Sequence, residues 1–109
     1  MFELIAIGSD HAGYKMKEEL IKHLREAGIE ICDCGALELD LDDNYLDYSP
    51  IVAKKVAKEE CEFGIVICGT GIGASISANK VDGIRAALCS EPLSAKLSRQ
   101  HNNANVVAL

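Results

Sequence analysis

The stretch Cys68 to Gly73, with the sequence CGTGIG, carries the residues best suited to chemistry in this chain. A cysteine ends the apolar run FGIVIC and stands before three glycines, which allow a tight turn whose backbone N–H groups can surround an anion. A helix expected directly behind the loop would add the positive end of its dipole. Such surroundings favour a thiolate, which can act as a base or a nucleophile. The loop therefore predicts either a nucleotide cradle with an incidental cysteine or a catalytic thiol beside an oxyanion cradle.

The nucleotide alternative has partial support. The loop is not a Walker A motif, because no Gly-Lys-Ser/Thr follows it. Gly69, Gly71 and Ala74 satisfy the looser dinucleotide pattern G-x-G-x-x-A, and Glu91 lies about twenty residues further on. However, a dinucleotide loop usually follows the first strand of its unit, and 109 residues leave little room for a separate substrate domain. A third interpretation is a turn that needs glycine only for its backbone geometry.

Three other positions carry groups capable of ligand contact. The segment from Gly8 to Gly13, GSDHAG, follows the first expected strand and holds Asp10 and His11 between glycines, which favours ligand contact over a simple loop cap. His101 stands at an expected helix end, where a histidine can also complement the helix dipole. Tyr48 precedes Ser-Pro and either packs or points into a cleft.

The remaining chemically capable residues are assigned to structure. Most cysteines in proteins are small buried hydrophobic residues, and four are assigned to that class: Cys32, Cys34, Cys61 and Cys89. The acidic run from Asp40 to Asp47 is expected to be a solvated loop rather than a metal site. Apolar residues interrupt its carboxylates, and no calcium-loop spacing appears.

Short apolar runs alternate with helical patterns along the chain. Gly28 is a natural helix stop, and Ser49 and Pro50 open another helix, with Ser49 as its cap. The expected strands are 4–7, 29–32, 63–68, 84–89 and 105–109, and the expected helices are 14–27, 49–60, 74–80 and 91–100. Because the strands are apolar without alternation, this order predicts a Rossmann-like three-layer α/β/α sandwich around a five-stranded parallel sheet. The last strand has no helix after it, so either a partner chain or a further segment is expected to cover it.

Ligands of open parallel sheets bind beyond the carboxyl ends of the strands. Asp10 and His11, the Cys68 loop, and residues 90–91 follow three of the expected strands, and residues 101–103 lie just before the last one. The sequence therefore predicts that these polar residues gather at one edge of the sheet.

Composition narrows the class of partner. A length of 109 residues indicates one domain, and half of the residues are apolar. The net charge of −6 and only five aromatic residues argue against a nucleic-acid surface or an anionic membrane surface. No apolar run approaches the roughly 20 residues that span a bilayer. Five cysteines without a C-x-x-C pair favour free thiols in a reducing cytoplasm.

With these motifs assembled, the sequence resembles the ribose-5-phosphate isomerase B family, which includes the galactose-6-phosphate isomerase subunits. The matching motifs are GSDHAG (8–13), DYSP (47–50), ICGTGIGASISANK (67–80) and GIRAALCSEPLSAKLSRQHNNANVVAL (83–109). They extend over nearly the whole chain, in order and with the expected spacing.

The resemblance implies an aldose–ketose isomerase that needs no cofactor and no metal and acts on a sugar phosphate through ring opening and an enediolate. Cys68 matches the general base that removes the C2 proton, and His101 matches the acid/base that opens the furanose ring. Asp10 and Thr70 match groups that assist ring opening and proton movement. Some members use a loop glutamate as base, and Ala74 stands at that position here. Positions that match substrate-binding residues are Asp10, His11, Tyr48, Gly69, Thr70, Gly71, Ile72, Gly73 and Asn102.

The resemblance also implies an assembly. Family members form their active site between two subunits, so a homodimer or a tetramer is expected, with His101 and Asn102 supplied by the partner of the chain that carries Cys68. They continue beyond the position of Leu109 with a tail that supplies phosphate-binding arginines and helices used in dimerisation. Residues 1–109 are therefore expected to form a single sugar-phosphate isomerase domain that lacks this tail.

Ribose 5-phosphate, interconverted with ribulose 5-phosphate in cytoplasmic carbohydrate metabolism, is the expected substrate. Galactose 6-phosphate and allose 6-phosphate are the alternatives within the same class of reaction. Two readings lie outside it: a non-catalytic nucleotide-binding module, and an inactive structural subunit of a hetero-oligomer. Neither nucleic acid nor a membrane is expected as a partner.

Overall fold

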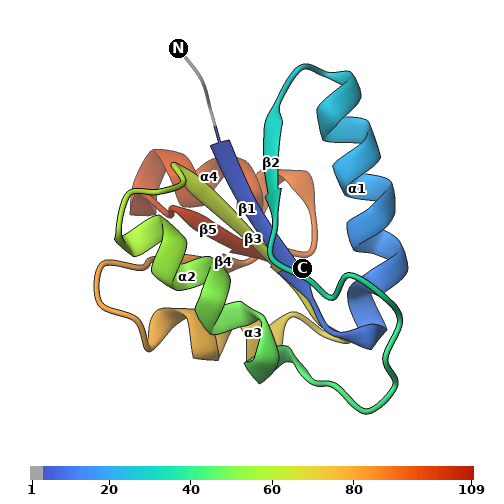
Figure 1. Cartoon of the computed structure of the whole chain (residues 1–109). Coiled ribbons are helices and arrows are strands. Elements are labelled where there is room, and N and C mark those ends of the chain that lie inside the picture. The colour runs from blue at the N-terminus through green and yellow to red at the C-terminus, as the bar shows by residue number, and fades with distance from the viewer. Residues whose placement is uncertain (1–3) are drawn as a thin grey trace.

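The computed structural model describes residues 4–109, so the first three residues of the expected 1–109 domain lie outside the described residues. Strands alternate with α-helices along the chain (Figure 1). The strands are β1 (Leu4–Ser9), β2 (Glu30–Asp33), β3 (Phe63–Ile67), β4 (Ala86–Leu88) and β5 (Val106–Ala108). The α-helices are α1 (Tyr14–Glu26), α2 (Ser49–Ala57), α3 (Ile72–Asn79) and α4 (Pro92–Asn102). Two short 3-10 helices, η1 (His11–Gly13) and η2 (Tyr45–Asp47), precede α1 and α2.

The strands form one five-stranded sheet in the order β2-β1-β3-β5-β4, and every pairing in it is parallel. Ala6 of β1 lies opposite both Cys32 of β2 and Gly64 of β3. At the carboxyl end of the same strand, Ser9 lies opposite Ile67. The predicted five-stranded parallel sheet is therefore confirmed.

Helices cover both faces of this sheet. Because alternate residues of a strand point to opposite faces, Ala6 and Ile7 belong to different cores. On one face α2 and α3 pack on the sheet around a core that includes Ala6, Val52, Ala53, Val66, Ala74 and Ala78. On the other face, Ile21 of α1 packs with Ile7 and Ile67. Full burial of an isoleucine side chain stabilises the fold by about 1.5–3 kcal/mol, so both faces contribute, and the predicted three-layer sandwich is confirmed.

The start of α2 differs from the prediction. Tyr48, not Ser49, occupies the N-cap position, and Pro50 is the second residue of the helix rather than the first. Ser49 is the first residue of the helix, is buried, and donates its hydroxyl to the carbonyl oxygen of Ala74 over 2.8 Å. The assignment of Ser49 as the cap is therefore wrong, because its hydroxyl joins α2 to α3 instead.

The helix behind the glycine loop begins at Ile72, before the expected residue 74. Gly71 holds the N-cap position with a φ of 79°, a left-handed conformation that glycine adopts without steric cost. The chain therefore turns from β3 into α3 within four residues, Cys68 to Gly71. This short connection fixes the thiol of Cys68 close to the first turn of the helix.

Candidate active site

The site lies where the chain leaves two neighbouring strands toward opposite faces of the sheet. After β1 the chain enters η1 and α1, which lead to β2 at one side of the sheet. After β3 it enters α3, which packs on the other face and leads toward β4 at the other side. Ligands of open α/β sheets bind at such a switch point. Asp10 and Cys68 directly follow the paired residues Ser9 and Ile67, so they stand on its two sides.

Cys68 is enclosed by its own loop. The residue is 8% exposed, and its Sγ accepts a hydrogen bond from the backbone N–H of Gly71 over 3.2 Å. Its own backbone N–H donates to the carbonyl oxygen of Leu109 at the end of β5. This hydrogen bond holds the sulfur at the N-terminus of α3. The geometry thus places an oriented sulfur at the switch point between β1 and β3.

The rest of the loop provides backbone donors. Thr70 is exposed, and its hydroxyl accepts from the N–H of Ile72 over 3.2 Å. Gly69 and Ile72 are also exposed, whereas Gly73 is half-buried. A Cβ on Gly73 would lie 2.5 Å from the ring of Tyr45, so glycine is required there for close packing. The N–H of Gly71 is already committed to the thiol, so an anion in this loop competes with sulfur for that donor.

Asp10 shapes the other side of the crevice. It is 6% exposed, and its Oδ1 accepts from the backbone N–H of Ala12 over 3.0 Å and of Gly13 over 3.4 Å. These bonds make it the N-cap of η1. Gly13 packs directly on the side chain of Ile67. Asp10 therefore holds η1 against the end of β3, beside the Cys68 loop.

His11 has a partner that the sequence did not reveal. The Oδ1 of Asp43 accepts from the His11 backbone N–H over 2.8 Å and lies 2.9 Å from its Nδ1. The hydrogen bond to Asp43 raises the pKa of His11 above its usual value, although the small desolvation of the ring opposes it. Burial acts to raise the pKa of Asp43, but the bonds from His11 lower it overall.

The expectation of a solvated acidic loop is wrong for Asp43, which is 8% exposed, and confirmed for Asp40, Asp42 and Asp47, which are exposed. No spacing rule separates the buried carboxylate from its neighbours. The contact joins residues 32 positions apart, and only the folded path of the loop brings them together.

Two tyrosines hold the acidic loop, residues 40–47, against the carboxyl edge of the sheet. The Tyr48 ring packs so closely on Gly35 that a Cβ there would lie 2.8 Å from it, and a Cβ on Gly8 would lie 3.4 Å from the Tyr48 Cβ. Its hydroxyl lies beside Asp43, and burial together with that charge raises the pKa of the phenol. The Tyr45 ring covers Gly73 of the loop that follows β3. Tyr45 was not among the expected site residues, and its aromatic character was the only available signal.

His101 and Asn102 lie at the other end of the sheet. They belong to the last turn of α4, which starts after the carboxyl end of β4 and returns to the amino end of β5. Both are exposed, and the Asn102 carbonyl oxygen accepts from Arg85 Nε over 2.6 Å. The prediction that residues 101–103 share one edge with Cys68 is therefore wrong within a single chain. In a parallel sheet, a residue just before a strand lies at the amino edge, whereas the residues that follow the strands lie at the carboxyl edge.

Glu91 is not available for the role that the dinucleotide pattern would give it. It is the N-cap of α4, where its carboxylate accepts from the backbone N–H of Leu93 over 2.7 Å and of Ser94 over 2.9 Å. The Ser94 hydroxyl also donates to it. These bonds lower the pKa of Glu91. The acidic residue of the pattern thus caps its own helix.

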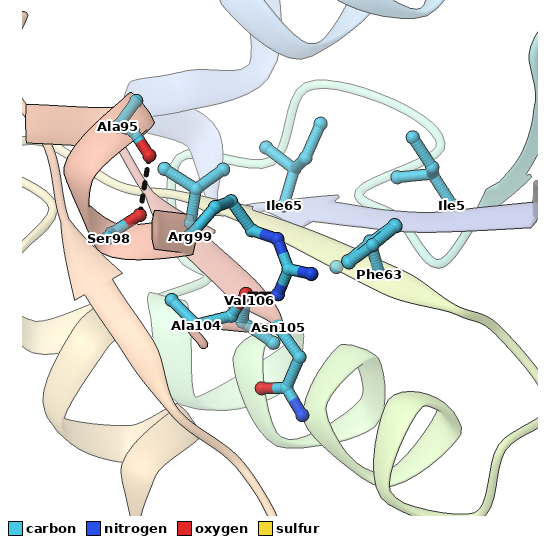
Figure 2. Close-up of a pocket in the computed structure, with 11 residues that line it drawn as sticks. Ile5, Phe63, Ile65, Ala95, Ser98, Arg99, Ala104, Asn105 and Val106 are labelled. Carbon is cyan, nitrogen blue, oxygen red and sulfur yellow. Dashed lines mark hydrogen bonds between the residues drawn. The ribbon is translucent and has the colours of Figure 1, made fainter. Parts of the chain in front are cut away.

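An apolar groove of about 360 Å³ lies away from this crevice, between α4 and the first residues of β1, β3 and β5 (Figure 2). Ile5, Phe63 and Ile65 line its floor, and Arg99 supplies its one charged side chain. The Arg99 guanidinium stacks 4.9 Å from the centre of the Phe63 ring and donates to the Ala104 carbonyl oxygen over 2.5 Å. The apolar lining does not suit a sugar phosphate.

Two observations concern residues 4–109 as a whole. Within that range no three histidine, cysteine or acidic side chains come together in a way that could hold a metal ion. No helix in the same range has the length and apolar character needed to cross a membrane.

Comparison with known proteins identifies the family. A family model described as Ribose/Galactose Isomerase matches residues 5–109. Ribose-5-phosphate isomerase B of Escherichia coli (strain K12) is 53% identical over 104 residues, covering 95% of this chain and 69% of that protein. The structure of ribose-5-phosphate isomerase B from Clostridium thermocellum has a TM-score of 0.94 at 50% identity and covers 97% of this chain and 71% of that one.

A further structure, ribose-5-phosphate isomerase B from Mycoplasma genitalium with bound ribulose-5-phosphate, has a TM-score of 0.95 at 43% identity and covers 100% of this chain and 72% of that one. The chain thus spans between 69% and 72% of the length of these three relatives. The agreement extends over the whole sheet and over both sides of the crevice, as the resemblance in sequence predicts. The chain belongs to the Ribose/Galactose Isomerase family.

Proposed function

We propose that this chain is a cofactor-independent aldose–ketose isomerase that interconverts ribose 5-phosphate and ribulose 5-phosphate. The observation that carries the proposal is the thiol of Cys68, held by the N–H of Gly71 at the switch point between β1 and β3. A proton on the carbon next to a carbonyl is acidic only when the resulting enediolate is stabilised, so a base and oxyanion donors must lie together. The loop after β3 holds both the base, Cys68, and the backbone N–H donors within a few residues.

In the proposed reaction the Cys68 thiolate removes the proton from C2 of the open-chain aldose. The C–H electron pair becomes the C1–C2 double bond of the enediolate, and O1 takes the negative charge. The proton is then returned to C1, O1 gains a proton and O2 loses one, which leaves the ketose. Backbone N–H groups from Gly69 to Gly73 stabilise the charge on oxygen, and Asp10 and Thr70 assist the proton movements.

The proposed sugar site includes His11 and Tyr48 beside the loop. His11 follows Asp10 in η1 and contacts Asp43, and the Tyr48 hydroxyl lies beside the same carboxylate. A partly exposed imidazole beside a glycine-rich loop suits the anionic end of a sugar phosphate. The remaining proposed contacts, Ile72 and Asn102, complete the set expected from the sequence.

We propose a homodimer in which His101 and Asn102 of one chain complete the site of the other. The support is the separation within a single chain, where Cys68 follows β3 at the carboxyl edge and His101 precedes β5 at the amino edge. Ring opening requires an acid/base close to the sugar. Only a second copy can bring this histidine to the crevice, and closed two-fold assemblies are the commonest way to do so. We place the enzyme in the cytoplasm, in keeping with its free thiols.

Galactose 6-phosphate and allose 6-phosphate are the competing substrates, and the matched family model covers both ribose and galactose isomerases. A nucleotide-binding module is disfavoured, because Glu91 is committed to capping α4.

The test is an isomerase assay with ribose 5-phosphate, followed by the two hexose 6-phosphates, on the wild type and on Cys68→Ala. We expect kcat with the pentose phosphate to fall about a thousandfold in the variant, the size of a general-base contribution. The matched control is Cys61→Ala, which removes a buried thiol just before β3, at the far end of the strand from the loop. Turnover of none of these sugar phosphates, or equal losses in both variants, would overturn the proposal.

A further inference from the structure

Asp43 is the one buried carboxylate of the acidic loop, and a single oxygen of it contacts His11 twice. Asp43 Oδ1 accepts from the His11 backbone N–H over 2.8 Å and lies 2.9 Å from Nδ1 of the same residue. The Asp43 side chain is 4% exposed, whereas that of His11 is 35% exposed. This two-point contact fixes both the start of η1 and the orientation of the ring.

Hydrogen bonds and packing within the acidic loop fix the position of the Asp43 carboxylate. Asn44 directly follows it and forms a capping box around η2, accepting from the Leu46 N–H over 2.8 Å while its own N–H donates to Asp47 over 3.0 Å. The Tyr45 ring then packs on Gly73. Because the residues directly after Asp43 are anchored in this way, the position of the carboxylate does not depend on its contact with His11 alone.

The second oxygen of the same carboxylate is left without compensation. Asp43 Oδ2 is buried and accepts no hydrogen bond from the residues that the structure describes, although the Tyr48 hydroxyl lies nearby. A buried carboxylate with an unsatisfied oxygen is costly unless a cation stands against it. The group that can carry this positive charge is the His11 imidazole, whose Nδ1 lies 2.9 Å from the other oxygen, Oδ1, of the same carboxylate.

Within residues 4–109, η1 can supply a cation beside the Cys68 loop. The chain carries a net charge of −6. All three of its arginines lie toward the amino ends of the strands: Arg25 near the end of α1, Arg85 before β4, and Arg99 in the last turns of α4. Within residues 4–109 of a single copy, no arginine therefore lies at the carboxyl edge, where the sugar phosphate is proposed to bind.

We propose that Asp43 is a positioning residue that holds the His11 ring by Nδ1 and thereby presents a cationic Nε2–H to the anionic end of the substrate. Nδ1 donates to Asp43, so the proton on Nε2 remains for a ligand oxygen, and charge-assisted bonds of this kind are about twice as strong as neutral ones. The inference rests on the proposed function for the identity of the anion. Asp43 itself contacts no substrate.

Other titratable groups lie on the elements around the ring. Asp10, at the end of β1, adds a negative charge that also raises the pKa of His11. Tyr48 stands on the far side of Asp43, and Cys68 stands across the crevice in the loop after β3. Asp10, Tyr48 and Cys68 stay in place when Asp43 is changed, so a change in the titration of His11 reports on Asp43.

The experiment is a kinetic comparison of Asp43→Asn with the matched control Asp42→Asn, whose side chain is exposed on the same loop. Asparagine keeps the shape and the acceptor oxygen but loses the charge. We expect KM for ribose 5-phosphate to rise about tenfold at pH 8 with a smaller change in kcat. The rise should shrink toward pH 5.5, where the imidazole protonates without help. Asp42→Asn should behave as the wild type.

A double variant separates positioning from folding. In a His11→Gln background, Asp43→Asn should change KM less than twofold, because the group through which it acts is gone. A tenfold rise in both backgrounds, or a rise that does not depend on pH, would overturn the proposal and assign Asp43 to loop stability alone.

NMR titration tests the inference without any turnover. The chain has three histidines, so the ring resonances are assigned with His23→Gln and His101→Gln. In the wild type the pKa of His11 should lie above 6.5, and inorganic phosphate should shift its resonance more than that of His23. An ordinary or lowered pKa would overturn the proposal even in an active enzyme. A raised pKa with no sugar-phosphate turnover would instead count against the proposed function.

Discussion

The backbone N–H of Gly71 donates to Cys68 Sγ over 3.2 Å, which closes the loop between β3 and α3 on its own thiol. This contact depends on the φ of 79° at Gly71, a value that L-residues other than glycine adopt only at a cost. The same glycine also packs against neighbouring strands, since a Cβ there would lie 2.5 Å from Leu88 Cδ1 and 3.0 Å from the backbone of Leu109. Backbone conformation and close packing thus both require glycine at the thiol.

Gly71→Ala should therefore lower both stability and activity. We expect a loss of about 3 kcal/mol in the free energy of unfolding, from backbone strain and overpacking together. Urea denaturation measures this loss. Isomerase activity should fall further than stability alone explains, because the donor to Cys68 moves.

Gly83→Ala is the matched control, because Gly83 has a φ of 88° but nothing within 4 Å of its Cβ position. It should cost only about 1 kcal/mol and leave activity unchanged. Equal losses of stability in the two variants would mean that packing against Leu88 and Leu109 contributes nothing.

The sheet and the nearer side of the site could be predicted from the sequence because they depend on local order. An apolar strand followed by glycine and a polar residue marks the carboxyl edge, which correctly brings Asp10 and Cys68 together. His101 was misplaced because its position depends on the direction of α4 and not on its distance from β5 in sequence. Asp43 was missed because its burial depends on the folded path of a loop with no periodic pattern.

The buried Lys17 allows a second test of stability, which concerns the contribution of a buried charge pair to the free energy of unfolding. Lys17 is fully buried, and its Nζ lies 3.1 Å from both carboxylate oxygens of Asp33 and 2.7 Å from Glu18 Oε1. Removing one partner of a buried pair leaves an uncompensated charge, so Asp33→Ala should cost about 3 kcal/mol in the free energy of unfolding.

Lys17→Met should cost clearly less than Asp33→Ala, because methionine fills a similar volume without a charge and Asp33 is partly exposed to water. Thermal and urea unfolding of both variants provide the comparison. A larger loss for Lys17→Met would show that the ion pair, and not the need to neutralise the buried ammonium, governs stability at this position.

The cap of α4 should make stability depend on pH. Hydrogen bonds from Ser94 and Leu93 lower the pKa of Glu91 below its usual 4.5. A lowered pKa in the folded state means that the stabilisation is fully present above pH 4.5 and is lost as the pH falls through the folded value. The difference in melting temperature between wild type and Glu91→Ala should therefore be constant from pH 6 to 8 and shrink below pH 4.5. Glu62→Ala, which removes an exposed carboxylate before β3, should show no such change.

A complementation experiment tests the shared site, because Cys68 and His101 lie at opposite ends of one chain. Cys68→Ala and His101→Ala should each be nearly inactive alone. When the two are unfolded, mixed in equal amounts and refolded, half of the dimers are mixed. Each mixed dimer then holds one site with both groups intact and one with neither. Activity should therefore return to about a quarter of the wild-type value.

The value of a quarter distinguishes the alternatives because it follows from which chain supplies each group. If Cys68 and His101 acted within one chain, every site in every dimer would lack one group, and refolding would restore nothing. If His101 had no part in the reaction, His101→Ala would be active before mixing. Refolding each variant separately controls for changes during denaturation, and Cys61→Ala mixed with His101→Ala should return more than a quarter, since one partner then carries both catalytic groups.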